Sequence, residues 1–188
     1  MDGLNALFHS AVGINGFLDA FFLFCAVALP LVIVVFTILF FIRMHITRYA
    51  SSKGIVQLKH FGLWLESMFD VLFATGGAWM LSEVVKRVVN TPRPYVLDPT
   101  LPHLLELPKY AAFPSSHTAV LVALALIVFY EYKRVGAFLL AAAIVVGFAR
   151  VIVGVHSIED IIGGIAVGVL AAFLVATIRR HMDHVDMA

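Results

Sequence analysis

The sequence predicts an all-α membrane protein, a bundle of transmembrane helices, because it is strongly apolar and its apolar residues occur in long runs. The chain has 188 residues, of which 62% are hydrophobic and only 13% are charged. Soluble domains are closer to half apolar and a quarter charged. A helix of about 20 apolar residues crosses a hydrocarbon core roughly 30 Å thick. No repeat period or low-complexity tract divides the chain, so we expect one domain over residues 1–188.

Five apolar runs are predicted to span the membrane. They extend over Ala20–Ile42, Leu63–Val85, Thr118–Tyr130, Val135–Val153 and Ile158–Ile178. The third run is short unless its first turn includes Pro114–His117. A sixth span could come only from Leu4–Leu18, where Gly13, Asn15 and Gly16 favour a short helix lying in the membrane interface.

The distribution of Lys and Arg predicts how the spans are oriented. Five spans place eight basic residues on one side of the membrane and five on the other. The positive-inside rule puts the eight in the cytoplasm. No Lys or Arg precedes Arg43, so the first span lacks the basic region of a cleavable signal and is expected to be retained. We therefore expect a multi-pass protein of the inner (plasma) membrane, with the connection over residues 86–114 facing the periplasm or the exterior.

That outward connection is predicted to be stiff. Six of the seven prolines lie between Asn90 and Pro114, and each proline restrains its own backbone and that of the residue before it. The connection also carries apolar side chains, which are suited either to the membrane surface or to covering the helical core: Leu101, Leu104, Leu105 and Leu107.

The last span has small residues at every fourth position, namely Gly164, Gly168 and Ala172. Small residues allow the backbones of two helices to approach closely. We interpret this face as packing within the bundle. A dimer seam is the alternative, so the oligomeric state stays open.

Three outward segments carry ionisable residues, which are functional candidates by default in a membrane protein. The first places Lys86 and Arg93 seven residues apart at the end of the second span. The planar fork of Arg can hold two phosphate oxygens, whereas Lys supplies a compact charge. Alternatively, both side chains only extend toward lipid headgroups.

The second segment, Pro114-Ser115-Ser116-His117, opens the third span. Serines cap helices, and the free N–H groups of a helix N-terminus bind anions. His117 could donate a proton to a leaving oxygen, because imidazole titrates near neutral pH. The alternative is a plain serine cap followed by an interfacial histidine.

The third segment joins the fourth and fifth spans and contains Arg150, His156 and Asp160. Residues four apart share one face of a helix. A carboxylate at Asp160 could therefore fix the tautomer of His156 and leave its other ring nitrogen free to attack an electrophile. Alternatively, Ser157–Asp160 forms a capping box, which would make Asp160 structural.

The predicted topology places all three segments on the outer side, where they can converge. Three cations, a helix N-terminus, two histidines and one carboxylate are what phosphoryl transfer requires. The sequence has no cluster of carboxylates there for two metal ions, and Cys25, the only cysteine, offers neither a disulfide nor a cysteine metal site. We expect no metal, no cofactor and no nucleic-acid partner.

These residues resemble the pattern of the type 2 phosphatidic acid phosphatase superfamily, which is Lys-x6-Arg-Pro, then Pro-Ser-x-His, then Arg-x5-His-x3-Asp. All nine specified positions match in order between Lys86 and Asp160. The family commonly has Gly in place of Ser116 and Ser in place of Ala149.

The resemblance implies a metal-independent membrane phosphatase. His156 would attack phosphorus and form a phosphohistidine, with Asp160 orienting it. His117 would protonate the leaving oxygen and then activate the water that hydrolyses the intermediate. The phosphate oxygens would be held by Lys86, Arg93, Ser115, Ser116 and Arg150.

The substrate implied by the resemblance is a lipid phosphate or diphosphate that enters from the bilayer. We expect hydrolysis of undecaprenyl diphosphate to undecaprenyl phosphate, a step of cell-wall biogenesis. Phosphatidic acid, phosphatidylglycerophosphate and a lipid A phosphate are the alternative substrates. A non-catalytic lipid-phosphate binder or transporter is the alternative of another class.

Overall fold

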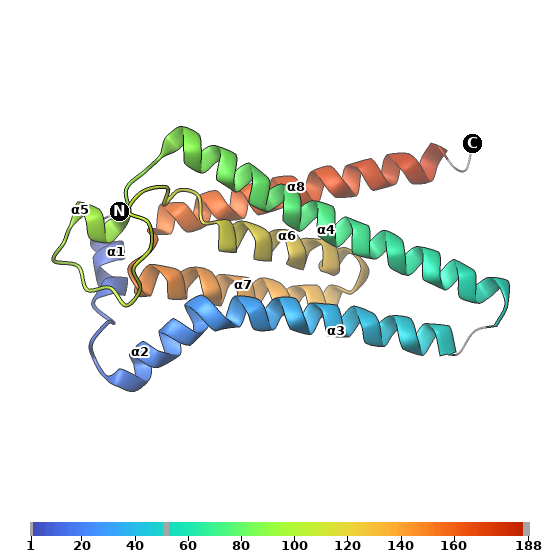
Figure 1. Cartoon of the computed structure of the whole chain (residues 1–188), viewed down its shortest axis with the longest axis horizontal. Coiled ribbons are helices and arrows are strands. Elements are labelled where there is room, and N and C mark those ends of the chain that lie inside the picture. The colour runs from blue at the N-terminus through green and yellow to red at the C-terminus, as the bar shows by residue number, and fades with distance from the viewer. Residues whose placement is uncertain (1, 51–52, 186–188) are drawn as a thin grey trace.

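The computed structural model describes residues 2–50 and 53–185, and the elements in it are helices. Figure 1 shows the long helices running side by side along one axis, with short helices at one end. In chain order they are α1 (Asp2–His9), α2 (Gly16–Leu23), η1 (Phe24–Ala28), α3 (Leu29–Ala50), α4 (Ile55–Val89), α5 (Pro94–Leu97), α6 (Ser116–Glu131), α7 (Lys133–Ile152) and α8 (Ile158–Val185). The all-α fold class is confirmed.

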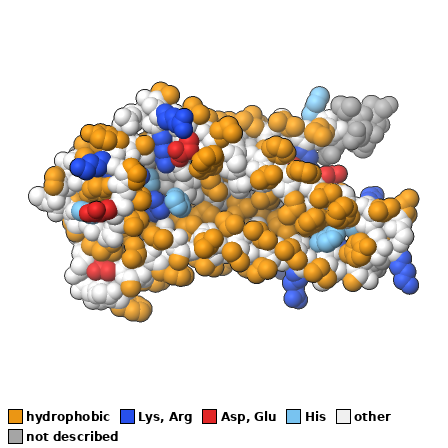
Figure 2. Space-filling model, viewed as in Figure 1, with side chains coloured by type: hydrophobic (Ala, Val, Ile, Leu, Met, Phe, Trp, Pro, Cys, Tyr) orange, Lys and Arg blue, Asp and Glu red, His pale blue; other side chains and the backbone are white. Residues whose placement is uncertain are grey.

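Four helical segments of the described chain are long and apolar enough to cross a membrane. They are Gly16–Ala50, Ile55–Val89, Lys133–Ile152 and Ile158–Met182. Each coincides with one predicted span, although the third ends one residue before the predicted Val153. The first two are longer than predicted, by eight residues at the end of the first and at the start of the second, because polar residues there continue the helix outside the apolar run. Figure 2 shows hydrophobic side chains covering much of the middle of the molecule.

The remaining predicted span is α6, which has only 16 residues. It packs against α4, α7 and α8, so protein surrounds most of it. Ser115 caps its start and Tyr132 its end, and ten of its residues are buried. At 1.5 Å per residue the helix is about 24 Å long.

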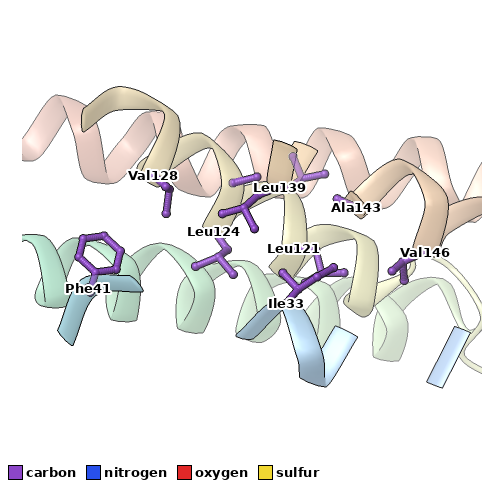
Figure 3. Packing of buried hydrophobic residues seen from close by; sticks show 10 residues of the cluster. Ile33, Phe41, Leu121, Leu124, Val128, Leu139, Ala143 and Val146 are labelled. Atoms are coloured by element: carbon purple, nitrogen blue, oxygen red, sulfur yellow. The ribbon is translucent and has the colours of Figure 1, made fainter. Parts of the chain in front are cut away.

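The core lies where α3, α6 and α7 meet. Figure 3 shows side chains from these helices in contact, including Ile33, Leu124, Val128 and Leu139. A single residue separates α6 from α7, and Gly136 makes this possible because a Cβ there would lie 2.2 Å from the Cα of Phe129. The two helices therefore run antiparallel in close contact.

The small residues of α8 face α6, as the bundle-packing interpretation predicts. A Cβ at Gly164 would lie 2.6 Å from the Ser115 carbonyl oxygen, and one at Gly168 would lie 2.5 Å from that of Ala119. Ala172 belongs to the buried cluster on the same face. This contact fixes the start of α8 against the start of α6.

The proline-rich connection folds back over the helix ends. Leu104, Leu105 and Leu107 pack on a buried cluster that includes Cys25 and Val153, so these leucines cover the core. Gly154 has φ +86°, and a Cβ there would lie 2.7 Å from that of His103. A glycine is required at this position because the connection passes so close to the turn between α7 and α8.

The N-terminal stretch forms the short helix α1, and its last residues from Gly16 begin the first long helix. Phe8 of α1 stacks against Phe148 of α7 at 5.4 Å between ring centroids. Asn5 bonds to the first turn of α8: its Oδ1 accepts from the Ile158 amide at 3.1 Å, and its Nδ2 donates to Glu159 at 3.3 Å. This helix thus braces the turn that carries His156.

Candidate active site

The candidate site lies at the end of the bundle where α4 and α7 terminate and where α6 and α8 begin. Figure 2 shows basic, acidic and histidine side chains at both ends of the bundle, including this end, near α1 and α5. The backbone N–H of Ser115 donates to the carbonyl oxygen of Asp160 at 2.9 Å, which joins the start of α6 to the start of α8.

His156 and Asp160 form a buried pair. Nδ1 of His156 lies 3.1 Å from Oδ2 of Asp160, and both side chains are almost fully buried. The same oxygen accepts the Ser157 N–H at 2.9 Å, and the Asp160 N–H donates to Ser157 Oγ at 3.4 Å. Asp160 therefore orients the histidine and also forms the capping box, so the two sequence interpretations hold together.

Burial sets the charge of His156. Removal from water lowers the pKa of His156 to about 4. The hydrogen bond to Asp160 and its negative charge raise the pKa and offset part of this effect. The imidazole is therefore neutral near pH 7, which is the state a nucleophile needs. Burial likewise lowers the pKa of Arg93, but a guanidinium has so high an ordinary pKa that it stays charged.

Two buried guanidinium groups lie beside this pair, and backbone carbonyls hold them. Arg93 donates from Nε to Pro108 and from Nη1 to Val155, both at 2.7 Å. Arg150 donates from Nη1 to the Ala26 carbonyl at 3.1 Å. Its Nε is buried without a hydrogen-bond partner. Among the described residues no carboxylate anchors either arginine, so their positive charges remain available to an anion.

Lys86 and the start of α6 share a carboxylate. Glu83 Oε1 lies 3.2 Å from Lys86 Nζ and accepts from Ser116 Oγ at 3.1 Å. Glu83 thus positions Lys86 and joins the end of α4 to the start of α6. Ser115 is fully buried, and its hydroxyl accepts from the Thr118 N–H as the helix cap.

The site brings the predicted residues together. His117 is exposed on the first turn of α6. Charge–charge interactions link it to four of the other predicted residues, namely Arg150, His156, Lys86 and Arg93. Within the described residues, no group of three His, Cys, Asp or Glu side chains could hold a metal ion.

Sequence reasoning missed two supports of this site. Asn5 braces the first turn of α8, and nothing in the local sequence indicates that contact. The Ala26 carbonyl holds Arg150, and here a signal was available. Pro30, the one proline outside the outward connection, lacks the N–H that would otherwise bond to the residue four positions back, which is Ala26.

A helical membrane bundle whose buried His–Asp pair lies among three cations and a helix N-terminus defines a membrane phosphatase. The chain belongs to the PAP2 superfamily, whose family model matches residues 67–182. It is therefore a hydrolase of the class that acts on phosphate esters, as the sequence resemblance predicted.

Known proteins of this family are similar over most of the chain. Undecaprenyl-diphosphatase BcrC of Bacillus subtilis (strain 168) is 29% identical over 143 residues, which cover 71% of either chain. The crystal structure of Aquifex aeolicus LpxE superposes with a TM-score of 0.72 at 24% identity, over 93% of each chain. A PAP2-type phosphatidylglycerolphosphate phosphatase from Bacillus subtilis gives a TM-score of 0.62 at 18% identity, over 96% of this chain and 86% of that one.

Proposed function

We propose that this protein hydrolyses undecaprenyl diphosphate to undecaprenyl phosphate through a phosphohistidine at His156. The observation that carries the proposal is the buried contact of 3.1 Å between His156 and Asp160, beside Arg93 and Arg150. Because Asp160 occupies the Nδ1 side of the ring, Nε2 is the nitrogen that attacks phosphorus.

The reaction proceeds in two steps. In the first, Nε2 of His156 forms a bond to the terminal phosphorus while the bond from phosphorus to the leaving oxygen breaks, and His117 gives that oxygen a proton. In the second, His117 takes a proton from water as the water attacks the phosphohistidine, which releases inorganic phosphate and restores both histidines. The exposed position of His117 suits this exchange of protons.

The cations hold the equatorial phosphate oxygens, whose negative charge grows in the transition state. Arg93 and Arg150 are fixed by carbonyl groups before substrate arrives, so little reorganisation is needed. Lys86 and the amides that open α6 complete the cradle.

The similarity to undecaprenyl-diphosphatase BcrC supports a polyprenyl diphosphate as the substrate. Phosphatidic acid, phosphatidylglycerophosphate and a lipid A phosphate have headgroups of the same chemistry and are the competing substrates. The excess of Lys and Arg at the other end of the bundle supports a site that faces the periplasm or the exterior.

Phosphate release by the purified full-length protein tests this proposal. Undecaprenyl diphosphate, phosphatidic acid and phosphatidylglycerophosphate are compared in one detergent with EDTA present, for wild type, His156→Ala and His181→Ala. His181 is an exposed histidine at the far end of α8 and serves as the matched control. We expect activity in EDTA, preference for the diphosphate, and its loss only in His156→Ala.

Each other outcome has a definite meaning. Preference for a glycerophospholipid would overturn the substrate and leave the chemistry intact. Loss of activity in EDTA would overturn metal independence. Binding of the lipid without phosphate release by folded wild type, and equally by His156→Ala, would favour the lipid-phosphate binder.

A further inference from the structure

The three cations of the candidate active site are held by two different kinds of partner. Backbone carbonyl oxygens, which carry no net charge, hold Arg93 and Arg150. A carboxylate holds Lys86 instead: its Nζ lies 3.2 Å from Oε1 of Glu83, which is about one turn earlier in α4. Among the described residues, Lys86 is the one of these three cations that forms an ion pair, so its charge is balanced before any phosphate arrives.

The Ser116 side chain holds the same carboxylate from the start of α6. Its hydroxyl donates to Oε1 of Glu83 at 3.1 Å. A serine hydroxyl has one proton to donate, so while that proton is directed at Glu83 it is not available to a phosphate oxygen. The Glu83 carboxylate therefore accepts from two donors that a phosphate oxygen could also use.

The contact with Lys86 limits how far Glu83 can lie from a phosphate bound at that lysine. A charged hydrogen bond from the Lys86 ammonium to a phosphate oxygen would be about 2.8 Å long. Together with the 3.2 Å between Lys86 and Glu83, this places the phosphate oxygen within about 6 Å of the carboxylate oxygen. The Debye length in physiological salt is about 8 Å, so the two negative charges repel each other. The Lys86 side chain is only 14% exposed, which limits screening by solvent further.

From these contacts we propose that Glu83 competes with the phosphate group for Lys86 and Ser116, and thereby lowers the affinity of the site for phosphate. Without phosphate, Oε1 of Glu83 accepts from both donors. A phosphate oxygen that binds Lys86 accepts one of the three ammonium protons and is repelled by the carboxylate. The competition helps the site to release inorganic phosphate after each hydrolysis. This inference rests on the proposed function, in which Lys86 binds phosphate.

Glu83→Gln tests the competition by the sign of its effect. Glutamine can still accept hydrogen bonds from Lys86 and Ser116, but it lacks the negative charge. Binding of radiolabelled inorganic phosphate to the purified full-length protein is measured by equilibrium dialysis in detergent, at low and at high salt. We expect the dissociation constant to fall about three- to tenfold at low salt, between the effects typical of surface and buried charge pairs. The fall should be smaller at high salt, because salt screens the repulsion.

Glu106→Gln is the matched control. Glu106 is a largely exposed carboxylate on the proline-rich connection, and its ion-pair partner is His103, at 3.9 Å. The control removes the same charge at the same end of the bundle without a contact to Lys86, so it should leave the dissociation constant close to that of wild type. Lys86→Gln should weaken phosphate binding, which shows that the labelled phosphate occupies this site.

The other outcomes are distinct. A dissociation constant that is unchanged or higher in Glu83→Gln would overturn the competition and leave Glu83 as a support for Lys86. An equal fall in Glu106→Gln, or undiminished binding in Lys86→Gln, would overturn it as well. If Glu83→Gln does not fold, as judged by thermal unfolding, Glu83→Ala replaces it with the same expected fall, because alanine favours the helix. A wild type that binds phosphate with this dependence on Glu83 but releases none from the lipids would overturn the proposed function and leave the competition standing.

Discussion

At the residue scale, one carboxylate oxygen of Asp160 organises the candidate site. It holds the His156 ring at 3.1 Å and the Ser157 amide at 2.9 Å. The first turn of α8 allows both contacts, because the Asp160 side chain points back toward the residues before the helix. The Ser157 amide and the His156 ring both lie on that side of the turn. From the sequence alone the two roles looked like alternatives, and the geometry makes them one arrangement.

Asp160→Asn separates the two roles. An asparagine can still accept the Ser157 amide, but it lacks the charge that holds the correct tautomer of His156. By analogy with serine-protease triads, we expect kcat for phosphate release to fall by about 10²–10⁴-fold while KM changes little. Glu159→Gln, one residue earlier, is the control and should retain activity. Similar losses in both variants, with lowered melting temperatures, would instead indicate a structural role.

The pKa of His156 predicts how stability depends on pH. In the folded protein it is lowered to about 4, against 6.5 in an unfolded chain. Between these values the unfolded state binds more protons, so the contribution of neutral His156 is complete above pH 6.5 and is lost as pH falls through about 4. Melting temperatures in detergent over this range should fall more steeply for wild type than for His156→Gln. Parallel curves for the two proteins would contradict the burial of a neutral imidazole.

At the element scale, the break between α2 and α3 supports the site. Pro30 cannot donate a hydrogen bond, and the segment Phe24–Ala28 winds as a π-helix, in which the Leu29 amide bonds to Phe24. The Ala26 carbonyl is thereby released and accepts Nη1 of Arg150. Single turns of π-helix often occur at functional sites, and here the turn supplies an anchor for Arg150, which we propose binds phosphate.

Pro30→Ala tests this anchor. The new amide at position 30 can bond to the Ala26 carbonyl, close the α-helix and compete with Arg150. A neutral hydrogen bond contributes about 0.5–1.5 kcal/mol, so we expect kcat/KM to fall about two- to tenfold while the helix itself becomes no less stable. Val34→Ala, one turn further along α3, is the control for a change in the same helix. Unchanged kcat/KM in Pro30→Ala would show that Arg150 does not need this carbonyl.

The elements differ in how well the sequence predicts them. Apolar runs located four of the spans because those runs are long. The Pro–Ser motif located the start of the short helix α6 because Ser115 is a local cap. The true ends of α3 and α4 were missed because polar residues outside the apolar run continue the helix. Contacts such as Asn5 with Ile158 join residues 153 positions apart, and no local pattern indicates such a pair.

At the scale of the whole molecule, the same helices connect two polar ends. At the end with the candidate active site, Lys86, Arg93 and Arg150 lie near the start of α6. At the other end Arg179 of α8 binds Asp70 of α4 and Glu131 of α6, and lies 3.8 Å from Glu66. This network joins three helices where they leave the apolar core. Its central residue is separated from its partners by dozens of positions in the chain, so the sequence did not indicate it.

Arg179→Gln tests whether the network stabilises the bundle without taking part in the chemistry. Removal of the guanidinium leaves three carboxylates close together. The groups are partly exposed, so we expect a loss of about 1–3 kcal/mol, between the values for surface and buried pairs. Thermal unfolding in detergent measures the loss, with Arg134→Gln as the exposed control. Because about 24 Å of α6 separates the network from His156, kcat at a temperature where both proteins are folded should stay within about twofold of wild type. A tenfold fall in kcat with an unchanged melting temperature would instead mean that the two ends of the bundle are coupled.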